Sequence, residues 1–320
     1  MPAEWPTEVV RRAESLHMEL CADIDRFVDW HQLPDFFRPL VEHYYLPLAL
    51  WLSDCKRQQH TLVVGICGGQ GSGKSTLAEF LHLAWEYLGL RSAGFSLDDI
   101  YLSRAQRAQL AADVHPLLAT RGVPGTHDIP LGMDIIDRLC GLGGPGPVSL
   151  PMFDKGADDR RPRSLWPVQS VPVDILLLEG WCVGARPWRG GEAPINTLEQ
   201  HEDSDGSWRN FINKQLRGPY RDLFARLDRL VMLKVPDMDS VLDWRSLQEQ
   251  KLRARGGKGM RADEIGRFIQ YYERITVNML AEMPQRADCV LELGRDHSIC
   301  GVRLNPGPPG DRVEKQKTRR

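Results

Sequence analysis

The residues with the clearest chemistry lie in the segment GGQGSGKST, from Gly68 to Thr76. It fits the pattern G-x-x-x-x-G-K-[ST], in which glycines let backbone N–H groups turn inward around phosphates. Lys74 is expected to reach the β- and γ-phosphates of a nucleoside triphosphate, and Ser75 to ligate Mg²⁺ through its hydroxyl. This phosphate-binding loop, called the P-loop below, consists of Gly68, Gly69, Gln70, Gly71, Ser72, Gly73, Lys74, Ser75 and Thr76.

A second ligand for the metal is expected at the end of a neighbouring strand. The apolar run Ile175–Leu178 ends at Glu179, where a carboxylate can hold Mg²⁺ directly or through water. A strand-end glutamate that only caps a helix is the alternative. Ser75 and Glu179 are therefore the predicted metal ligands.

Two acids follow another apolar run, SAGFSL, and predict a catalytic base. Asp98 and Asp99 are expected just outside the sheet, where ligands bind in open α/β folds. Phosphoryl transfer needs an acceptor oxygen in line and a carboxylate to take its proton. Asp98 is nearer the strand and is the predicted base, whereas an N-terminal helix cap is the alternative that suits Asp99.

Two polar segments further along the chain indicate an anion-binding side of the site. The turn at Pro124-Gly125 is expected to deliver Thr126, His127 and Asp128 to the start of a helix, although Asp128 alone could be a cap. Basic side chains in an otherwise slightly acidic chain favour a bound substrate carboxylate or nucleotide phosphate, with a solvated basic loop as the alternative. These side chains lie in the segment LPMFDKGADDRRPRS and are Lys155, Arg160, Arg161 and Arg163.

The segment Asp243–Met260 predicts a basic helix that ends in glycines. As a mobile lid it could close over the nucleotide, exclude water and stabilise the transferring charge. The residues that would do so are Arg245, Arg253, Arg255 and Lys258. An exposed basic helix without a catalytic part is the alternative.

An α/β domain is expected to position these residues. Runs that are apolar throughout and separated by helix-length stretches predict a parallel sheet covered on both faces. The predicted strands are Thr61–Ile66, Arg91–Leu97, Val173–Leu178, Leu230–Val235 and Cys289–Leu293, with a helix over Ser75–Leu88. We expect a domain over residues 61–303 with its lid at about 243–262, and a helical extension over 1–60 that packs on this domain. A surface insertion is expected over 192–206 and a disordered tail over 304–320.

Composition excludes several classes of partner. The 320 residues carry a formal net charge of −2, which gives no general attraction to nucleic acid or an anionic membrane. No apolar run approaches the ~20 residues that span a bilayer, and the N-terminus does not read as a signal peptide. The seven cysteines are scattered without a C-x-x-C pair, so we expect a reduced, cytoplasmic setting and no nucleic-acid or membrane partner.

Taken together, the motifs resemble the D-glycerate 3-kinase family, which belongs with the phosphoribulokinase, uridine kinase and pantothenate kinase group of P-loop kinases. The resemblance covers residues 61–293. It rests on the P-loop, D-D-x-Y at 98–101, P-G-T-H-D at 124–128, P-x-[FY]-D-K at 151–155, L-x-E-G-W at 177–181 and D-W-R at 243–245. Ile100, where the family usually has an aromatic residue, and the glycine-poor segment Asp158–Arg163 depart from the family pattern.

The resemblance implies a three-layer P-loop NTPase fold with a five-stranded parallel sheet. It also implies Mg-ATP-dependent phosphorylation of the 3-hydroxyl of D-glycerate to 3-phosphoglycerate. In this interpretation Lys74 and Asp98 are catalytic, and Arg253 joins the P-loop in binding ATP. The substrate side would consist of Asp99, Tyr101, Thr126, His127, Asp128, Lys155 and Arg163.

Other functions stay open at this point. The acceptor could instead be a nucleoside, pantothenate or a sugar phosphate. A guanine-nucleotide switch would need an N-K-x-D reader, but Asn213-Lys214-Gln215-Leu216 lacks the final acid, and no L-S-G-G-Q segment of an ATP-driven transporter is present. An inactive ATP-binding relative and the oligomeric state are not decided by the sequence.

Overall fold

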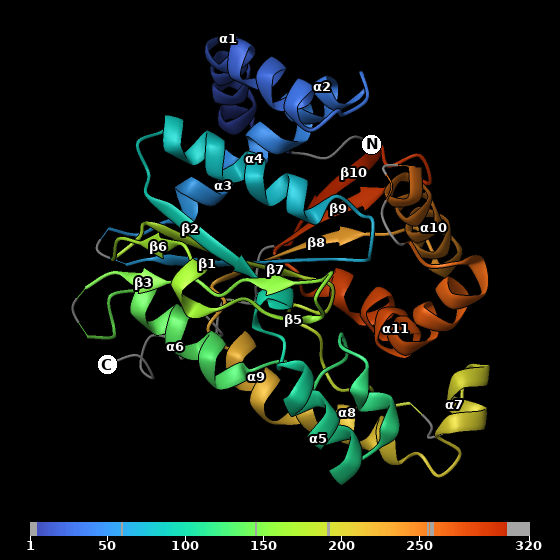
Figure 1. Cartoon of the computed structure of the whole chain (residues 1–320). Coiled ribbons are helices and arrows are strands. Elements are labelled where there is room, and N and C mark those ends of the chain that lie inside the picture. Colours follow the sequence, from blue (N-terminus) through green and yellow to red (C-terminus); the bar gives the residue numbers. More distant parts are fainter. Residues whose placement is uncertain are drawn as a thin grey trace.

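The computed structural model describes residues 5–58, 60–144, 146–190, 193–254, 256 and 259–305. A six-stranded sheet lies at the centre of the molecule (Figure 1). Its strands follow in the spatial order β2 (Ser92–Ser96), β7 (Ile175–Gly180), β1 (Leu62–Gly68), β8 (Arg229–Lys234), β9 (Cys289–Leu293) and β10 (Ile299–Leu304). The neighbours from β2 to β9 are parallel, and β10 runs antiparallel to β9.

The predicted α/β class and the parallel strands are confirmed, but the prediction of a five-stranded sheet is wrong because β10 adds an edge strand. The sequence ICGVRL mixes polar and apolar residues, which is typical of an edge strand with one exposed side and gives a weak signal. Leu304, which we assigned to the tail, is the last residue of β10. The rest of the predicted tail, from residue 306 onward, lies outside the described residues.

The strands are apolar throughout because successive side chains enter two different cores. Val64 and Ile66 of β1 pack into the core on one face of the sheet, whereas Val63 and Cys67 pack into the core on the other. All residues of β1 and β7 are buried. The sheet is therefore covered on both faces, as the continuous apolar runs predict.

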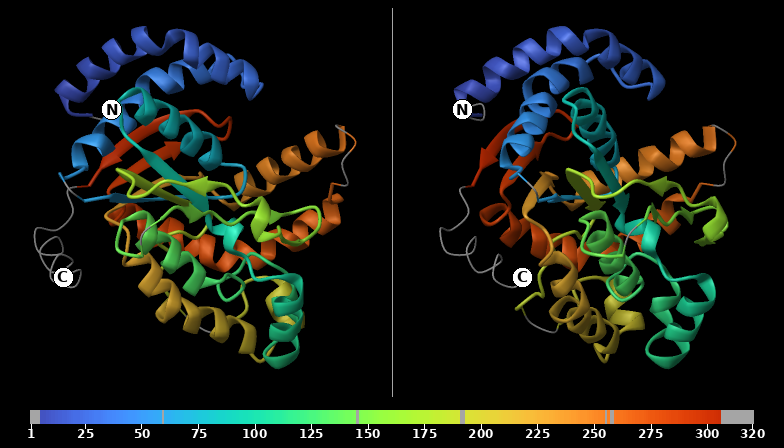
Figure 2. Two further views of the ribbon diagram at one scale, coloured as in Figure 1. Left: turned by 60° about the vertical axis from the view of Figure 1, so that its left-hand side comes forward. Right: turned by 90° about the vertical axis from the view of Figure 1, so that its left-hand side faces the viewer.

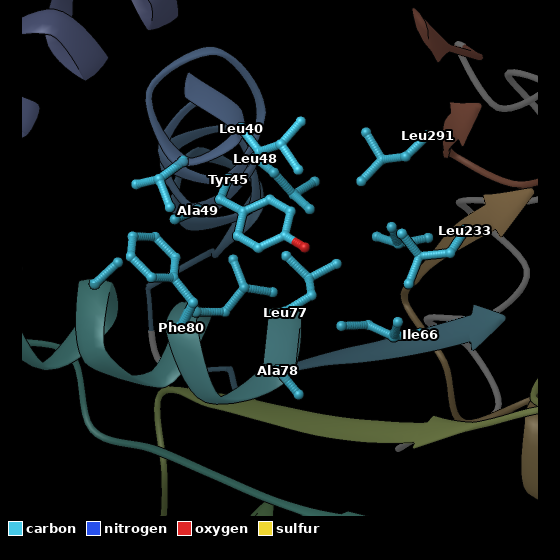
Figure 3. Close-up of a cluster of buried hydrophobic side chains, with 14 of the residues drawn as sticks. Leu40, Tyr45, Leu48, Ala49, Ile66, Leu77, Ala78, Phe80, Leu233 and Leu291 are labelled. Atoms are coloured by element: carbon cyan, nitrogen blue, oxygen red, sulfur yellow. The ribbon is translucent and has the colours of Figure 1, made fainter. Parts of the chain in front are cut away.

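The first face is covered by α4 (Lys74–Tyr87) and by the N-terminal helices (Figure 1). These helices are α1 (Thr7–Trp30), α2 (Phe37–Leu40) and α3 (Leu46–Cys55), with a π-helical segment, Val41–Tyr45, between α2 and α3. Trp85 in α4 donates from Nε1 to the carbonyl of Ala49 at 3.1 Å. Side chains of the N-terminal helices and α4 meet Leu233 and Leu291 of the sheet in one cluster (Figure 3). The helices before β1 therefore belong to the same core as the P-loop helix.

The opposite face is covered by helices that follow β2 in the chain (Figures 1 and 2). Their bounds are α5 (Arg104–Asp113), α6 (Ile129–Leu139), α7 (Thr197–Glu202), α8 (Ser207–Arg217), α9 (Pro219–Phe224) and α11 (Ala262–Glu282), and α10 (Met238–Ala254) projects from the body beside them. Short 3-10 helices span Leu97–Ile100, Pro116–Ala119, Arg163–Leu165 and Met283–Gln285. Two small antiparallel pairs complete the fold: β3 (Val148–Ser149) with β6 (Val168–Gln169), and β4 (Phe153–Asp154) with β5 (Asp159–Arg160).

The segment predicted as a surface insertion is exposed at most of its described positions, but the expectation is wrong for four buried residues, Leu198, Glu199, Asp203 and Gly206. Leu198, Glu199 and Asp203 are almost fully enclosed. Glu199 lies 2.5 Å from the guanidinium of Arg274, and Asp203 lies 3.4 Å from that of Arg209. Paired charges tolerate burial where single ones do not, so an acidic composition alone did not indicate exposure. None of the described helices is both long and apolar enough to cross a membrane.

Candidate functional site

The P-loop joins the end of β1 to the start of α4, as the motif predicts. Gly71 and Gly73 have φ angles of +79° and +83°, in the left-handed region that favours glycine. A Cβ atom on Gly68 would lie 2.5 Å from Ser72 Oγ. The loop therefore depends on glycine for its path, and α4 begins at Lys74 directly after it. A helix start with free N–H groups attracts phosphate.

Ser75 and Glu179, the predicted metal ligands, are in contact. Glu179 stands in β7 across from Ile66 of β1 and Ser96 of β2, so its carboxylate lies beside the P-loop. Ser75 Oγ donates to Glu179 Oε1 at 3.1 Å. Glu179 Oε2 is buried and has no hydrogen-bond partner in the described part of the chain.

This pair fits Mg²⁺ in its donor chemistry. A hydroxyl and a carboxylate are hard oxygen ligands, and the orphaned Oε2 is available to a cation or its water. Among the described residues no group of three or more His, Cys, Asp or Glu side chains could hold a metal on its own. A Mg²⁺ at Ser75 and Glu179 would thus take most of its ligands from nucleotide phosphates and water, as is usual for Mg²⁺ at phosphate sites.

Two more polar atoms of the P-loop are buried and have no hydrogen-bond partner among the residues that the structure describes. They are Gln70 Oε1 and Ser72 Oγ. A buried polar atom without a hydrogen bond costs about 1–3 kcal/mol, and such atoms are few in native proteins. Their concentration in one loop, beside the orphaned Glu179 oxygen, marks this edge of the sheet as a ligand site.

Asp98 is the acid whose charge interacts with Lys74 of the P-loop. Its Oδ2 lies 2.7 Å from Lys155 Nζ, and its Oδ1 accepts a hydrogen bond from the Tyr101 hydroxyl at 2.7 Å. Burial acts to raise the pKa of Asp98, but the charge and hydrogen bond of Lys155, helped by the charge of Lys74, lower it to about 2. The carboxylate is therefore ionised at neutral pH.

Asp99 uses its carboxylate to hold the backbone. It accepts from Ser96 N at 3.0 Å and from Phe153 N at 3.3 Å, and with Ser96 it forms a capping box of the 3-10 helix. Burial is the main cause that raises the pKa of Asp99 to about 6, and the neighbouring Asp98 adds to it. The structure thus places Asp99 in the capping position that the sequence left open.

The P-G-T-H-D turn places the side chain of His127 against Tyr101, whereas the side chains of Thr126 and Asp128 form hydrogen bonds with backbone groups. Thr126 Oγ1 donates to the Val123 carbonyl at 2.7 Å and accepts from Gly122 N at 3.0 Å, so this buried hydroxyl holds the turn itself. Asp128 caps α6 by accepting from Leu131 N at 3.2 Å. Its other oxygen is paired with an arginine of the following hairpin.

His127 stacks on Tyr101 with 4.6 Å between ring centroids. The two residues oppose each other in an isolated antiparallel bridge, which fixes the imidazole beside the Tyr101–Asp98 pair. Its Nδ1 is hydrogen-bonded to the Tyr220 hydroxyl, and its Nε2 is buried without a partner among the described residues. Burial lowers the pKa of His127 to about 3 although the charge of Asp98 acts in the opposite direction, so the ring is neutral.

The β4–β5 hairpin brings two of its cations to the site. Lys155 Nζ lies 2.7 Å from Asp98 Oδ2. The guanidinium of Arg160 donates to Asp128 Oδ2 and to the Tyr101 carbonyl, and each of these hydrogen bonds is 3.2 Å long. Arg161 lies 3.7 Å from Asp154 on the outer side. Arg163, a predicted substrate residue, is exposed and sits over the ring of Trp166, so the structure does not bring it to the others.

Sequence reasoning missed Arg107, which holds this hairpin in place. Its side chain is buried and donates to the carbonyls of Leu102, Ala119 and Asp158. It also lies 2.9 Å from the carboxylate of Asp158, whose φ of +54° is in the left-handed region. An arginine in the helical sequence RAQRAQL carries no signal that it will be enclosed.

The proposed lid helix, α10, touches the P-loop through an aromatic residue rather than through Arg253, which is exposed in its last turn. A Cβ atom on Gly71 would lie 2.8 Å from Trp244 Cβ. Trp244 stacks on His297 at 4.2 Å, and His297 Nε2 donates to the Gly71 carbonyl at 3.1 Å. His297 comes from the β9–β10 turn and was not predicted. Two other lid cations, Arg255 and Lys258, lie outside the described residues.

The sequence of the chain was compared with protein-family models and with known proteins. A scan against models of protein families finds no match. The chain is 33% identical over 227 residues to "Uncharacterized kinase mug58" of Schizosaccharomyces pombe, which covers 68% of this chain and 80% of that protein. It is 28% identical over 267 residues to "D-glycerate 3-kinase, chloroplastic" of Arabidopsis thaliana, which covers 77% of this chain and 57% of the plant protein.

Among solved structures, the chain resembles "D-glycerate 3-kinase from Cryptococcus neoformans var. grubii serotype A". The TM-score is 0.64 at 24% identity, over 82% of this chain and 96% of that one. At this identity the likeness shows the fold alone.

Proposed function

Because the chain belongs to the D-glycerate 3-kinase family of P-loop kinases, we propose that it phosphorylates the 3-hydroxyl of D-glycerate to give 3-phosphoglycerate. That it is an ATP-using phosphotransferase follows from its kinase relatives. The acceptor is the proposal, and one observation carries it: the carboxylate of Asp98, whose charge interacts with Lys74 of the P-loop, is held 2.7 Å from Lys155. A base and a cation for an acidic substrate thus stand together.

In this proposal the P-loop holds the triphosphate. Backbone N–H groups of residues 68–76 surround the phosphates, and Lys74 reaches the β- and γ-phosphates. Mg²⁺ bound by Ser75 and Glu179 would neutralise charge on the phosphate oxygens. Trp244 packs against Gly71 and His297 donates a hydrogen bond to the Gly71 carbonyl, and these contacts hold the conformation of the P-loop.

Asp98 has the role of orienting the acceptor hydroxyl and taking its proton. The hydroxyl oxygen forms a bond to the γ-phosphorus, the bond from that phosphorus to the β–γ bridging oxygen breaks, and its electron pair leaves with ADP. The proton passes to Asp98 and then to solvent. A carboxylate with a pKa of about 2 is a weak base, but it suffices because the transition state of phosphoryl transfer is loose and demands little deprotonation.

A hydroxy acid suits the groups around Asp98. The positive charges of Lys155 and Arg160 lie at this side of the site, and a carboxylate accepts hydrogen bonds from both types of cation. His127 adds a neutral polar group. A small acid could place its carboxylate on these groups and its terminal hydroxyl toward Asp98 and the P-loop.

The test is an acceptor screen with purified protein and Mg-ATP. ADP release is measured with D-glycerate, L-glycerate, uridine, pantothenate and ribulose 5-phosphate, each against a reaction without acceptor. We expect D-glycerate to give the highest kcat/KM. Release that is fastest with uridine, pantothenate or ribulose 5-phosphate would replace the proposed acceptor, and release with none above background would reject it.

A further inference from the structure

One buried polar atom near the site is not explained by ATP or Mg²⁺. Several buried atoms have no hydrogen-bond partner in the described part of the chain, and three of them, Gln70 Oε1, Ser72 Oγ and Glu179 Oε2, belong to the phosphate and metal region. His127 Nε2 belongs to the acceptor side, because its ring stacks on Tyr101, whose hydroxyl is bonded to Asp98. Buried groups without hydrogen bonds are rare enough that each calls for a cause.

The protons at Tyr220 decide which nitrogen of His127 carries hydrogen. Tyr220 is fully buried in α9, and its oxygen accepts a hydrogen bond from Gly125 N at 2.9 Å. The hydroxyl proton must then be donated elsewhere, and the partner that the described residues offer is His127 Nδ1. Nδ1 is therefore an acceptor, and a neutral imidazole that accepts at Nδ1 carries its proton on Nε2.

The surroundings keep the ring neutral. The ring of Tyr101 faces one side of the imidazole, and the ring of Tyr220 stands edge-on at 5.7 Å. The charge of Asp98 favours a protonated ring, but burial outweighs it and lowers the pKa of His127. A second proton would have to go to Nδ1 and would displace the hydrogen bond from Tyr220. The Nε2–H group is thus a neutral donor that does not titrate near pH 7.

We propose that Tyr220 is a positioning residue that holds His127 as the Nε2-protonated tautomer, so that Nε2–H donates to an oxygen of the acceptor substrate. The inference rests on the proposed function, and it deepens it by assigning a specificity-determining donor. An imidazolium would form an ion pair with Asp98. A neutral imidazole does not, and its N–H group stays free to orient the substrate. Because Nε2 is buried, its oxygen partner must be desolvated, which suits the carboxylate or hydroxyl of a small acid.

The tautomer can be measured without any enzyme activity. The full-length protein is labelled with ¹⁵N-histidine, and two-bond ¹H–¹⁵N spectra are recorded between pH 5 and 8. The chain has nine histidines, and the signals of His127 are those lost in His127→Gln. We expect a protonated Nε2 and an unprotonated Nδ1 across this range. A protonated Nδ1, or a titration of the ring between pH 5 and 7, would overturn the proposal.

The variant Tyr220→Phe tests the positioning role. Removal of the hydroxyl should shift the His127 spectrum toward the other tautomer and raise the KM for the acceptor by on the order of tenfold, with the KM for ATP within about twofold. Tyr45→Phe is the matched control, since Tyr45 is also buried but lies in the N-terminal helical core (Figure 3). It should change neither the spectrum nor either KM.

The outcomes separate this inference from the proposed function. If the wild-type protein turns over no acceptor, the proposed function fails, and the tautomer of His127 in wild type and Tyr220→Phe still decides the inference. If Tyr220→Phe leaves the spectrum unchanged, Tyr220 does not set the tautomer. If the spectrum changes while the acceptor KM does not, Nε2–H does not bind the acceptor, and that part of the proposal is refuted.

Discussion

At the scale of single residues, the contact between Asp98 and Lys155 decides the chemistry of the site. Burial alone would favour the protonated acid, and the nearby ammonium group reverses this preference. An ionised Asp98 can accept a proton, whereas a protonated one cannot. The lysine of the β4–β5 hairpin therefore matters for the state of the base as well as for the binding of an anion.

The variant Lys155→Met should expose this dependence. Loss of the charge leaves burial as the largest influence on Asp98, so its pKa should rise above the value of about 2 in the native protein. Since the ionised form is the active one, kcat/KM of the variant should fall as the pH drops through the raised pKa. In the native protein, Asp98 stays ionised over the same pH range, so its protonation should not lower kcat/KM there.

The measurement is the profile of kcat/KM for the acceptor between pH 4 and 8. Lys234→Met serves as the control, because Lys234 pairs with Glu292 at 3.4 Å and forms no hydrogen bond or ion pair with Asp98 in the described part of the chain. Its acid limb should match that of the native protein. Identical acid limbs in the native protein and Lys155→Met would show that Lys155 does not control Asp98.

The sequence could predict which side chains come together where a motif fixes the backbone. Ser75 and Glu179 are 104 positions apart and still meet, because a P-loop and the end of the adjacent parallel strand must lie at one edge of the sheet. Tyr220 could not be predicted, since its contact with His127 spans 93 positions and depends on how α9 packs. No local pattern encodes that packing.

At the scale of elements, the P-loop is held from two sides. Trp244 of α10 lies against Gly71, and the β9–β10 turn contributes His297. The strands that place the loop could be predicted from apolar runs, whereas β10 and its turn could not, because an edge strand needs only one apolar side. The turn that supports the P-loop thus leads into β10, the strand of the sheet that we did not predict.

Gly71→Ala should weaken ATP binding. Its φ of +79° is unfavourable for alanine, and the new Cβ would lie 2.8 Å from Trp244 Cβ. We expect an increase in the Kd for Mg-ATP on the order of tenfold or more, from a strain of about 1–2 kcal/mol in the left-handed region and the added clash. Isothermal titration calorimetry measures the affinity.

Gly89→Ala separates strain from the clash at the P-loop. Gly89 has a φ of +73°, and a Cβ there would meet no atom within 4 Å. This control should lose about 1 kcal/mol of stability and keep its affinity for ATP. Equal affinities in Gly71→Ala and Gly89→Ala would mean that the contact with Trp244 does not shape the P-loop.

At the scale of the whole molecule, the N-terminal helices and the P-loop helix share one core. The sequence predicts a helical extension packed on the main domain, and its helices share one core with α4 and the sheet. Aromatic contacts join the two parts, with Phe80 of α4 near both Phe27 and Tyr45. Periodicity predicts that a helix has an apolar face, but it does not tell which element that face will meet.

Leu48→Ala should therefore destabilise the catalytic core as well as α3. Leu48 is fully buried, and such a truncation costs about 2–5 kcal/mol. Urea unfolding, followed by tryptophan fluorescence and by ATP binding, should show one transition at lower urea for both signals. Met18→Ala, at an exposed site of α1, should stay within about 0.5 kcal/mol of the native protein. A change in tryptophan fluorescence at lower urea than the loss of ATP binding would contradict a shared core.

The most direct test of the account compares the native protein with Asp98→Asn. Both are incubated with Mg-ATP and D-glycerate, the products are identified by ³¹P NMR, and the affinity for ATP is measured in parallel. We predict 3-phosphoglycerate and ADP from the native protein, and a rate lower by about 10²–10⁴-fold in the variant with ATP affinity nearly unchanged. Equal rates of 3-phosphoglycerate formation by the two proteins would contradict Asp98 as the base, and the absence of a phosphorylated acid from the native protein would contradict the proposed function.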